Sequence, residues 1–262
     1  MQNIFLLQSD PDLGATLGER ERRAAAPACV ARGFRLRRGH WDGRTDSRSV
    51  DEPAGFGLLL LSGVLCRRVA QVERSAAEII GPGDLIRPWD LVTEWSTLPV
   101  ESTWDVLLPA RGAILDRAFG RRVAAYPAIS EQLVRRALMR SRYLAILTTI
   151  VGHRRLETRL HMLFWHLADR FGRMRGEWGD IAVPLTHSLL AELVAARRPS
   201  VSTALSRLQS QGVLGQRRGG WRLSGTIPPE YEALQGSGSA TTIRGAEAAS
   251  SPTRVDAQAL VR

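Results

Sequence analysis

Residues 187–225, HSLLAELVAARRPSVSTALSRLQSQGVLGQRRGGWRLSG, decide the fold of the C-terminal half of the chain. The segment holds two apolar patterns with helical spacing, which are Leu189, Leu190, Leu193 and Val194 in the first and Val201, Leu205 and Leu208 in the second. Pro199 falls in the first turn of the second helix, where the missing N–H costs nothing, and Gly212 ends that helix. The pattern predicts two short helices joined by a tight connection at 195–197.

The outward face of the second helix carries arginines and short hydroxyls. The candidate DNA-binding residues are Arg197, Arg198, Pro199, Ser200, Ser202, Thr203 and Arg207, followed by Arg217 and Arg218 at the tip of an expected two-stranded wing, 213–223. Guanidinium groups match the acceptors of guanine, and a helix N-terminus favours phosphate. Arg198 is the leading candidate for a base contact, whereas Ser200, Ser202, Thr203 and Arg207 suit bases and phosphates equally.

The excess positive charge lies in the same region. The 262 residues include 36 basic and 26 acidic side chains, a formal charge of +10, and every basic residue is arginine. Residues 153–226 hold 12 arginines against five acids, whereas residues 1–128 are almost balanced. Such a concentration is typical of a nucleic-acid-binding module. The alternative is a solvated basic face in a protein from an arginine-biased genome.

A long helix is expected before this region. Ser130 can cap a helix that runs to about Val151 without proline or glycine. A heptad seam, interrupted by Arg140, consists of Leu133, Ala137, Leu144, Leu147 and Val151. The seam packs either on the N-terminal part of its own chain or on the same helix of a second copy, and we favour the dimer.

A second helix follows Gly152. Leu156, Leu160, Leu163, Phe164, Leu167 and Phe171 form one apolar stripe, and Gly172 provides a stop. His161 and His166 are five residues apart and fall on different faces, so we expect surface or interface histidines and no shared metal site.

The first 128 residues are expected to form strands. Suitable runs lie at 30–37, 57–64, 65–72, 76–80 and 104–108, with a turn at Gly81-Pro82-Gly83-Asp84, a short helix at 113–119 and a polar loop at 42–53. Many short strands with glycine turns indicate a sandwich or barrel.

The stretch LLAELVAARRPSVSTALSRLQSQGVL, 189–214, resembles the winged helix-turn-helix of the Crp/Fnr family of bacterial transcription regulators. The shared features are a leucine-rich first helix, an arginine-led recognition helix and an RLxxxG exit into the wing. The stripe 156–171 with Arg159 resembles the family's helix between the dimer helix and the DNA-binding domain. The strands that end in the 81–84 turn resemble its cyclic-nucleotide-binding-like β-roll.

The resemblance implies an α+β fold in four parts. These are a jelly-roll-like β-roll sensor domain at 1–128, a dimerisation helix at 129–152, a winged helix-turn-helix domain at 153–226 and a tail at 227–262, whose Gly/Ser-rich composition predicts disorder. It implies a sequence-specific regulator that binds near-palindromic double-stranded DNA as a homodimer, with helix 198–211 in the major groove. RNA polymerase is a further expected partner if the protein is an activator.

Departures from the family pattern change two expectations. Ala195 stands where the family usually has glycine, and the acid and second arginine of its recognition helix are replaced by Pro199 and Thr203, so the family's best-known operator is not expected. The Gly-Glu pair and Arg-Ser/Thr-Ala triplet that hold a cyclic nucleotide do not follow Asp84; the triplet at 74–76 precedes the turn. We therefore expect an effector other than cAMP, if there is any, and no cofactor. Arg87, Trp89, Trp95 and Trp104 line either a different pocket or, as we favour, the core.

Other classes of protein find little support. Cys29 and Cys66 are too few for a disulfide scaffold, a four-thiolate metal site or an iron–sulfur sensor, and no apolar run approaches the ~20 residues of a membrane span. The sequence lacks a secretory signal pattern, so we expect a cytoplasmic protein. Without a phosphate-binding loop, a paired-histidine motif or a G-x-S-x-G elbow, an enzyme is not expected. The alternative function is a small-molecule-binding protein whose winged helix mediates protein contacts.

Overall fold

The computed structural model describes residues 2–43, 55–71, 74–88, 100–175 and 178–224. These residues form two compact units, and each is described by itself. The first comprises the described residues of 2–67 and 79–141, and the second those of 68–78 and 142–224. The expected loop at 42–53 lies almost entirely outside the described residues, as do Trp89, Trp95 and the tail.

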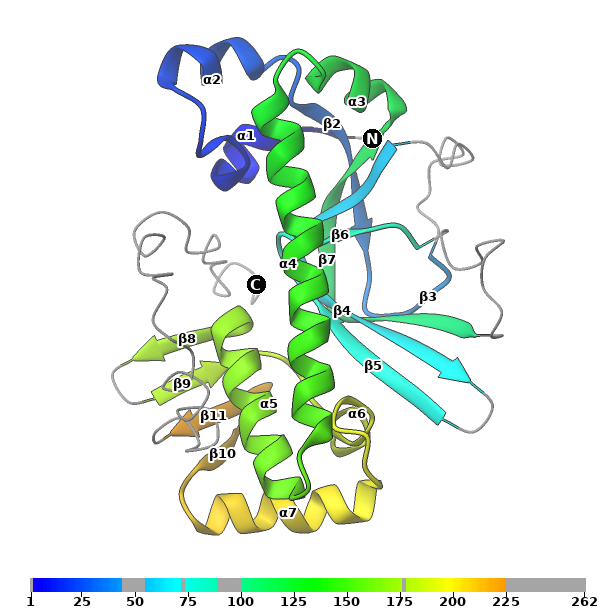
Figure 1. Cartoon of the computed structure of the whole chain (residues 1–262), viewed down its shortest axis with the longest axis vertical. Helices are drawn as coiled ribbons and strands as arrows, with labels where there is room; N and C mark the ends of the chain where they lie inside the picture. The colour runs from blue at the N-terminus through cyan, green and yellow to red at the C-terminus, as the bar shows by residue number, and fades with distance from the viewer. Residues whose placement is uncertain (1, 44–54, 72–73, 89–99, 176–177, 225–262) are drawn as a thin grey trace. The chain divides into compact units, whose positions relative to one another are not determined.

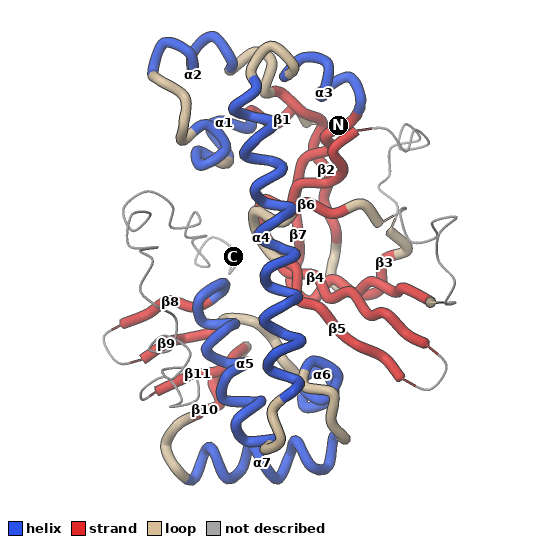
Figure 2. Tube along the Cα trace, viewed as in Figure 1, coloured by secondary structure: helices blue, strands red, loops and turns tan. Residues whose placement is uncertain are grey.

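A sheet of seven strands makes up most of the first unit, and only its residues 68–71 and 74–78 are grouped with the second unit (Figures 1 and 2). Its strands are β1 (Asn3–Phe5), β2 (Val30–Leu36), β3 (Gly39–Trp41), β4 (Gly55–Gln71), β5 (Arg74–Ile80), β6 (Leu85–Ile86) and β7 (Glu101–Asp116). The order is β1-β2-β7-β4-β5, with β3 paired to β7 and β6 to β4. β7 is long enough to pair antiparallel with both β2 and β3, so Trp41 lies opposite Trp104. The strand-rich N-terminal half is confirmed.

Two expected strands, 57–64 and 65–72, form the single strand β4. No turn residue separates them, and Gly63 absorbs the local change of direction with φ at +90°. A side chain at Gly63 would lie 2.4 Å from the carbonyl oxygen of Pro109, so only glycine fits this close approach. The split into two strands was therefore wrong.

The expected short helix at 113–119 was also wrong in its first four residues. These residues complete β7, and helix α3 (Arg117–Val123) begins only after Asp116. The Asp116 carboxylate accepts a hydrogen bond from the Phe119 amide at 2.8 Å, which is a side-chain N-cap. Three short N-terminal helices were not predicted, namely α1 (Leu6–Ser9), η1 (Pro11–Gly14) and α2 (Glu19–Ala25).

Helix α4 (Pro127–Gly152) begins three residues before the expected cap at Ser130, because proline itself suits a first helical turn. Ile129 and Leu133 are fully buried in a cluster with Leu6, Leu115 and Phe119. The Arg136 guanidinium pairs with the Asp10 carboxylate through two nitrogens. Leu133 therefore belongs to the core of its own subunit, and its assignment to a dimer seam was wrong.

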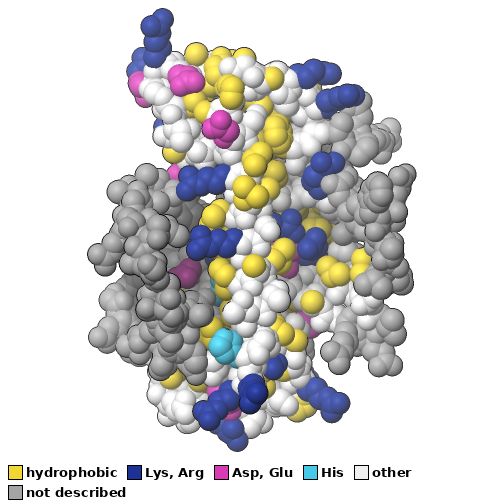
Figure 3. All heavy atoms as spheres, viewed as in Figure 1, with side chains coloured by type: hydrophobic (Ala, Val, Ile, Leu, Met, Phe, Trp, Pro, Cys, Tyr) yellow, Lys and Arg dark blue, Asp and Glu magenta, His cyan; other side chains and the backbone are white. Residues whose placement is uncertain are grey.

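The exposed face of α4 is offset by one residue from the expected seam. Val134 is 53% and Leu138 65% exposed, two of the four large hydrophobic residues that lie exposed in the described part of the chain. Small exposed residues continue the same face one, two and three turns further along, at Ser141, Ala145 and Thr148. Figure 3 shows apolar side chains along the upper part of this helix.

The second unit contains α5 (Leu156–Phe171), β8 (Gly172–Arg175), β9 (Trp178–Ile181), α6 (His187–Leu193), α7 (Arg198–Ser210), β10 (Leu214–Arg217) and β11 (Gly220–Ser224). The four strands form one antiparallel sheet of order β10-β11-β9-β8. The four middle residues of the α5 stripe are buried as expected, whereas Leu156 and Phe171 at its two ends are only partly buried. The apolar faces of α6 and α7 are buried as expected. The Trp221 ring packs 5.2 Å from that of Phe164, and its indole N–H donates to the Leu185 carbonyl. The hairpin β8–β9 was not predicted.

His166 contradicts the expected surface or interface position, because it is 3% exposed in the core of α5. Its ring meets Tyr143 edge-on at 5.6 Å, and Nε2 has no hydrogen-bond partner among the described residues. Burial, and secondarily the charge of Arg170, lowers the pKa of His166 to about 4. Across the described ranges, no helix has the length and hydropathy to cross a membrane.

Candidate DNA-binding interface

The turn between α6 and α7 sets the direction of the second helix. The Thr186 hydroxyl caps α6 by accepting from the Leu189 amide at 3.2 Å. At the other end, Arg159 donates to the Val194 carbonyl at 3.2 Å and to the His153 carbonyl at 2.6 Å. The next residue, Ala195, has φ at +50° and is the one non-glycine residue with positive φ in the described part of the chain. The tight turn requires this left-handed conformation even though no glycine is present.

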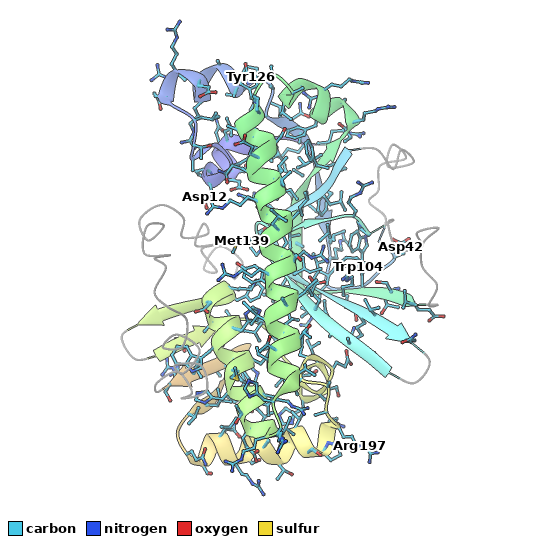
Figure 4. All side chains as sticks on the ribbon, viewed as in Figure 1. Asp12, Asp42, Trp104, Tyr126, Met139 and Arg197 are labelled. Carbon is cyan, nitrogen blue, oxygen red and sulfur yellow. The ribbon has the colours of Figure 1, made fainter. Side chains whose placement is uncertain are left out.

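The N-terminal end of α7 is exposed and cationic. Arg197 is the N-cap residue, Pro199 follows in the first turn, and this turn contains no acidic residue. Arg197, Arg198, Pro199, Ser200 and Thr203 are all exposed. Figure 4 shows Arg197 at this end of the helix, and Figure 3 shows arginine side chains gathered at the edge of the molecule where α7 lies. Positive side chains and the helix dipole reinforce each other here.

Ser202 differs from the other candidates, because it is only half-exposed and its hydroxyl is held from two sides. Its Oγ lies 2.9 Å from Nδ1 of His187, the first residue of α6. It also lies 3.2 Å from the Arg198 carbonyl oxygen, one turn earlier in α7. The hydroxyl is therefore anchored to both helices of the motif.

Arg207 is exposed on the same helix but is paired inside the protein. Its Nη1 lies 2.8 Å from the Glu157 carboxylate on α5. A backbone hydrogen bond, and next the bond from Arg207, lowers the pKa of Glu157. Arg207 therefore shares its charge with an acid, whereas Arg197 and Arg198 form no ion pair among the described residues.

The expected wing is present as the hairpin β10–β11, in which Arg217 lies opposite Gly220. Arg217 and Arg218 are exposed at its tip, and Gly219 turns the chain with φ at +81°. Asp180 of the neighbouring β9 accepts two hydrogen bonds from Arg222, at 2.8 and 3.2 Å, and lies 4.0 Å from Arg217. Arg218, at the same tip, forms no ion pair among the described residues.

Two candidate pocket residues of the first unit lie among the described residues, and they differ in their exposure to solvent. Trp104 is 3% exposed and its ring meets Trp41 edge-on at 5.6 Å, within the sheet (Figure 4). Arg87 is exposed. Trp104 is therefore a core residue, in agreement with the favoured interpretation. Among the described residues, no group of three or more potential metal ligands lies together.

Sequence reasoning missed three residues that modify the interface, namely His187, Glu157 and Asp180. Each belongs to an element other than α7, and its contact depends on tertiary packing. Of the three, only His187 stands at a position that the sequence marks, because it follows the Thr186 cap and is the first residue of α6.

The comparisons with known proteins agree with this arrangement. Residues 158–225 match the model of the Crp-like helix-turn-helix domain. No curated protein sequence matches the chain. Among solved structures, a cyclic nucleotide-binding domain containing protein from Listeria monocytogenes EGD-e is 12% identical with a TM-score of 0.60, over 74% of this chain and 89% of that one.

Two further solved structures are similar to this chain over about three quarters of its length. FixK2 from Bradyrhizobium japonicum is 16% identical with a TM-score of 0.56, over 78% of this chain and 96% of that one. A CRP-family transcriptional regulator from Thermus thermophilus is 19% identical with a TM-score of 0.53, over 76% of this chain and 96% of that one. These likenesses show the fold, and the helix-turn-helix match identifies its C-terminal domain. Residues 158–225 therefore form a Crp-like helix-turn-helix domain, and the chain as a whole shares its fold with these solved structures.

Proposed function

We propose that this protein is a transcription regulator of the Crp/Fnr type. In this proposal it binds near-palindromic double-stranded DNA as a homodimer, with α7 of each subunit in a major groove. The observation that carries the proposal is the exposed N-terminal end of α7, where Arg197 and Arg198 have no ion-pair partner among the described residues. Arginines at a helix end suit guanine acceptors and phosphates in the major groove. In this proposal Arg198 reads a base, and Arg217 and Arg218 bind phosphates beside the groove.

The nine candidate residues are expected to contribute to DNA binding in different ways. Arg197, Ser200 and Thr203 are exposed beside Arg198 and suit backbone or base contacts. Pro199 contributes no donor of its own and shapes the first turn. Arg207 has to leave or share Glu157 before it can reach DNA, so its contribution is smaller than that of Arg198.

A second copy of the chain is the proposed occupant of the exposed α4 face, which begins at Val134 and Leu138. Two large apolar residues on adjacent turns, followed by small residues, suit close packing of two identical helices. A two-fold dimer would set the two recognition helices about one duplex turn, ~34 Å, apart. In this proposal the chain consists of a sensor domain at 1–128, a dimerisation helix at 129–152, a DNA-binding domain at 153–226 and a tail at 227–262. The effector is proposed to be other than cAMP, and a contact with RNA polymerase would accompany activation.

The test is a footprint combined with mobility shifts at two salt concentrations. Two related half-sites and a steep fall of affinity with salt are expected, because each phosphate contact releases counterions. Arg198→Ala should weaken binding by ~1–3 kcal/mol at one base position and relax the preference there. Arg217→Ala, the matched wing variant, should weaken binding to all sequences alike. A single unrepeated site, or binding independent of salt, would contradict the proposal.

A further inference from the structure

The first unit has a cavity of about 300 Å³ that is lined by residues of β1, β2, β7 and α3. Figure 2 shows β1, β2 and α3 together in the upper part of the view. The wall of the cavity contains two guanidinium groups, those of Arg32 and Arg122, and one carboxylate, that of Asp116. No residue of this wall belongs to the turn at 81–84 or to the segment that follows it, where the cyclic-nucleotide pattern of the Crp/Fnr family would lie. The cavity is therefore distinct from the place to which that resemblance assigns an effector.

The Asp116 carboxylate holds two parts of this wall in position. Its Oδ2 lies 3.1 Å from Nη2 of Arg32, which forms an ion pair. Its Oδ1 accepts a hydrogen bond from the Phe119 amide at 2.8 Å and so caps α3, the helix that carries Arg122. Both oxygens of the acid are thus engaged within the protein. Two guanidinium groups and one carboxylate leave the wall with one net positive charge, which favours an anionic occupant.

The guanidinium group of Arg122 is oriented by the backbone of the neighbouring strand. Its Nη2 donates to the Val30 carbonyl at 2.6 Å, and its Nε donates to the Ala28 carbonyl at 3.4 Å. These two nitrogens form one edge of the planar group. The other edge consists of Nη1 and the second hydrogen of Nη2, and no described residue forms a hydrogen bond with Nη1. Such an edge matches the two oxygens of a carboxylate.

Apolar side chains border the same cavity. Val30 and the buried Ile114 belong to its wall, and Phe5 lies directly opposite Val30 in the β1–β2 ladder. Residues that face each other in antiparallel strands have Cβ atoms only ~4.5–5.5 Å apart, so the Phe5 ring adjoins the cavity. Phe5 is 55% exposed, which is unusual for a large apolar side chain in the described part of the chain. A ligand with an apolar body would cover this ring.

We propose that the cavity binds a small organic carboxylate, whose charged group lies on the outer edge of Arg122 and whose apolar body lies against Val30 and Phe5. A volume of about 300 Å³ suits a single aromatic ring with one or two substituents. An inorganic anion would occupy the same edge of Arg122 but leave the apolar surface uncovered. The inference goes beyond the proposed DNA binding and does not depend on it.

The experiment is a titration of the full chain with benzoate, followed by calorimetry and by amide NMR shifts. Benzamide is the neutral control of the same shape, and acetate keeps the charge without the ring. We expect a dissociation constant for benzoate of about 1 mM or lower. Benzamide and acetate should each bind at least ~10-fold more weakly, because one lacks the charge and the other the apolar body. The shifts should centre on residues 30–32 and 114–122.

Three variants test the assignment of the residues. Arg122→Gln should weaken benzoate binding at least ~10-fold, because the bidentate partner is lost. Arg121→Gln is the matched control, since Arg121 is an exposed arginine on the same helix that does not line the cavity, and it should bind benzoate as the wild-type chain does. Phe5→Ala should weaken benzoate binding by ~3–5-fold and leave acetate binding unchanged.

Four results would overturn the inference. These are equal affinity for benzoate and benzamide, equal weakening by Arg121→Gln and Arg122→Gln, no saturable benzoate binding up to ~20 mM, and tighter binding of a short polyglutamate peptide than of benzoate. The last result would assign the surface to an acidic protein segment instead. The titrations contain no DNA, so failure of this site and failure of the proposed function are observed in separate experiments.

Discussion

Replacing Ala195 by glycine should stabilise the helix-turn-helix. Ala195 occupies the left-handed region with φ at +50° and its side chain is exposed, so the substitution relieves strain and removes little packing. The left-handed conformation costs an L-residue ~1–2 kcal/mol. Glycine has greater conformational freedom in the unfolded chain, which lowers the free energy of unfolding by ~0.4–1 kcal/mol and so offsets part of this gain. The net increase in the free energy of unfolding is therefore about 0.8 kcal/mol from the middle of the two ranges, and at most about 1.6 kcal/mol.

The neighbouring Ala196→Gly is the matched control. Ala196 has no positive φ and its amide donates to the Ala191 carbonyl at 2.9 Å, so glycine there brings only its entropic cost and lowers stability by about 0.4–1 kcal/mol. Urea unfolding gives the free energies of both variants, and hydrogen exchange of the α6 and α7 amides locates the change. Equal destabilisation by the two substitutions would refute the assignment of strain to position 195.

Three further predictions concern other regions. The pKa of His166 is about 4 in the folded state and ~6.5 in the unfolded state, so the folded state binds fewer protons. The free energy of unfolding should therefore be fully retained above pH 6.5 and fall by up to ~3 kcal/mol toward pH 4. A pH series with His166→Phe should lack this contribution. Glu157→Gln should raise the affinity for non-specific DNA at low salt and steepen its salt dependence by about one phosphate contact, because Arg207 is released; unchanged salt dependence would show that Arg207 does not reach DNA. If the proposed dimer forms through the α4 face, Leu138→Arg should yield monomers in sedimentation experiments. Phe5→Arg, at a residue of similar exposure on β1, should leave the proposed dimer intact.

The sequence predicted the elements that local patterns determine. The α5 stripe ends at Gly172, α7 starts at Arg198 with Pro199 in its first turn, and the wing follows Gly212, all as the apolar spacing and the turn residues indicate. The expected exposure of the arginine-rich end of α7 is confirmed as well. The DNA contacts of the candidate residues stay predictions.

Errors arose where tertiary packing overrides a local pattern. Leu133 and Val134 are adjacent apolar residues, and no spacing rule tells which of them faces the core of its own subunit. His166 lies among apolar neighbours on α5, but a lone histidine gave no sign that its ring would be enclosed. The partners of Ser202 and Arg207 come from other helices, 15 and 50 residues away in the sequence, so the composition of α7 alone could not reveal them.

The two cysteines have a practical consequence for labelling. Cys29 and Cys66 are both fully buried, and burial raises the pKa of the Cys29 thiol to about 11, despite the opposing charge of Arg122. Alkylating reagents attack the thiolate and need access to sulfur, so both side chains should stay unmodified in the folded protein at neutral pH. A cysteine introduced at the exposed Gln216 of the wing would then be the single reactive thiol. A fluorophore attached there would report wing docking on a duplex in the otherwise native chain.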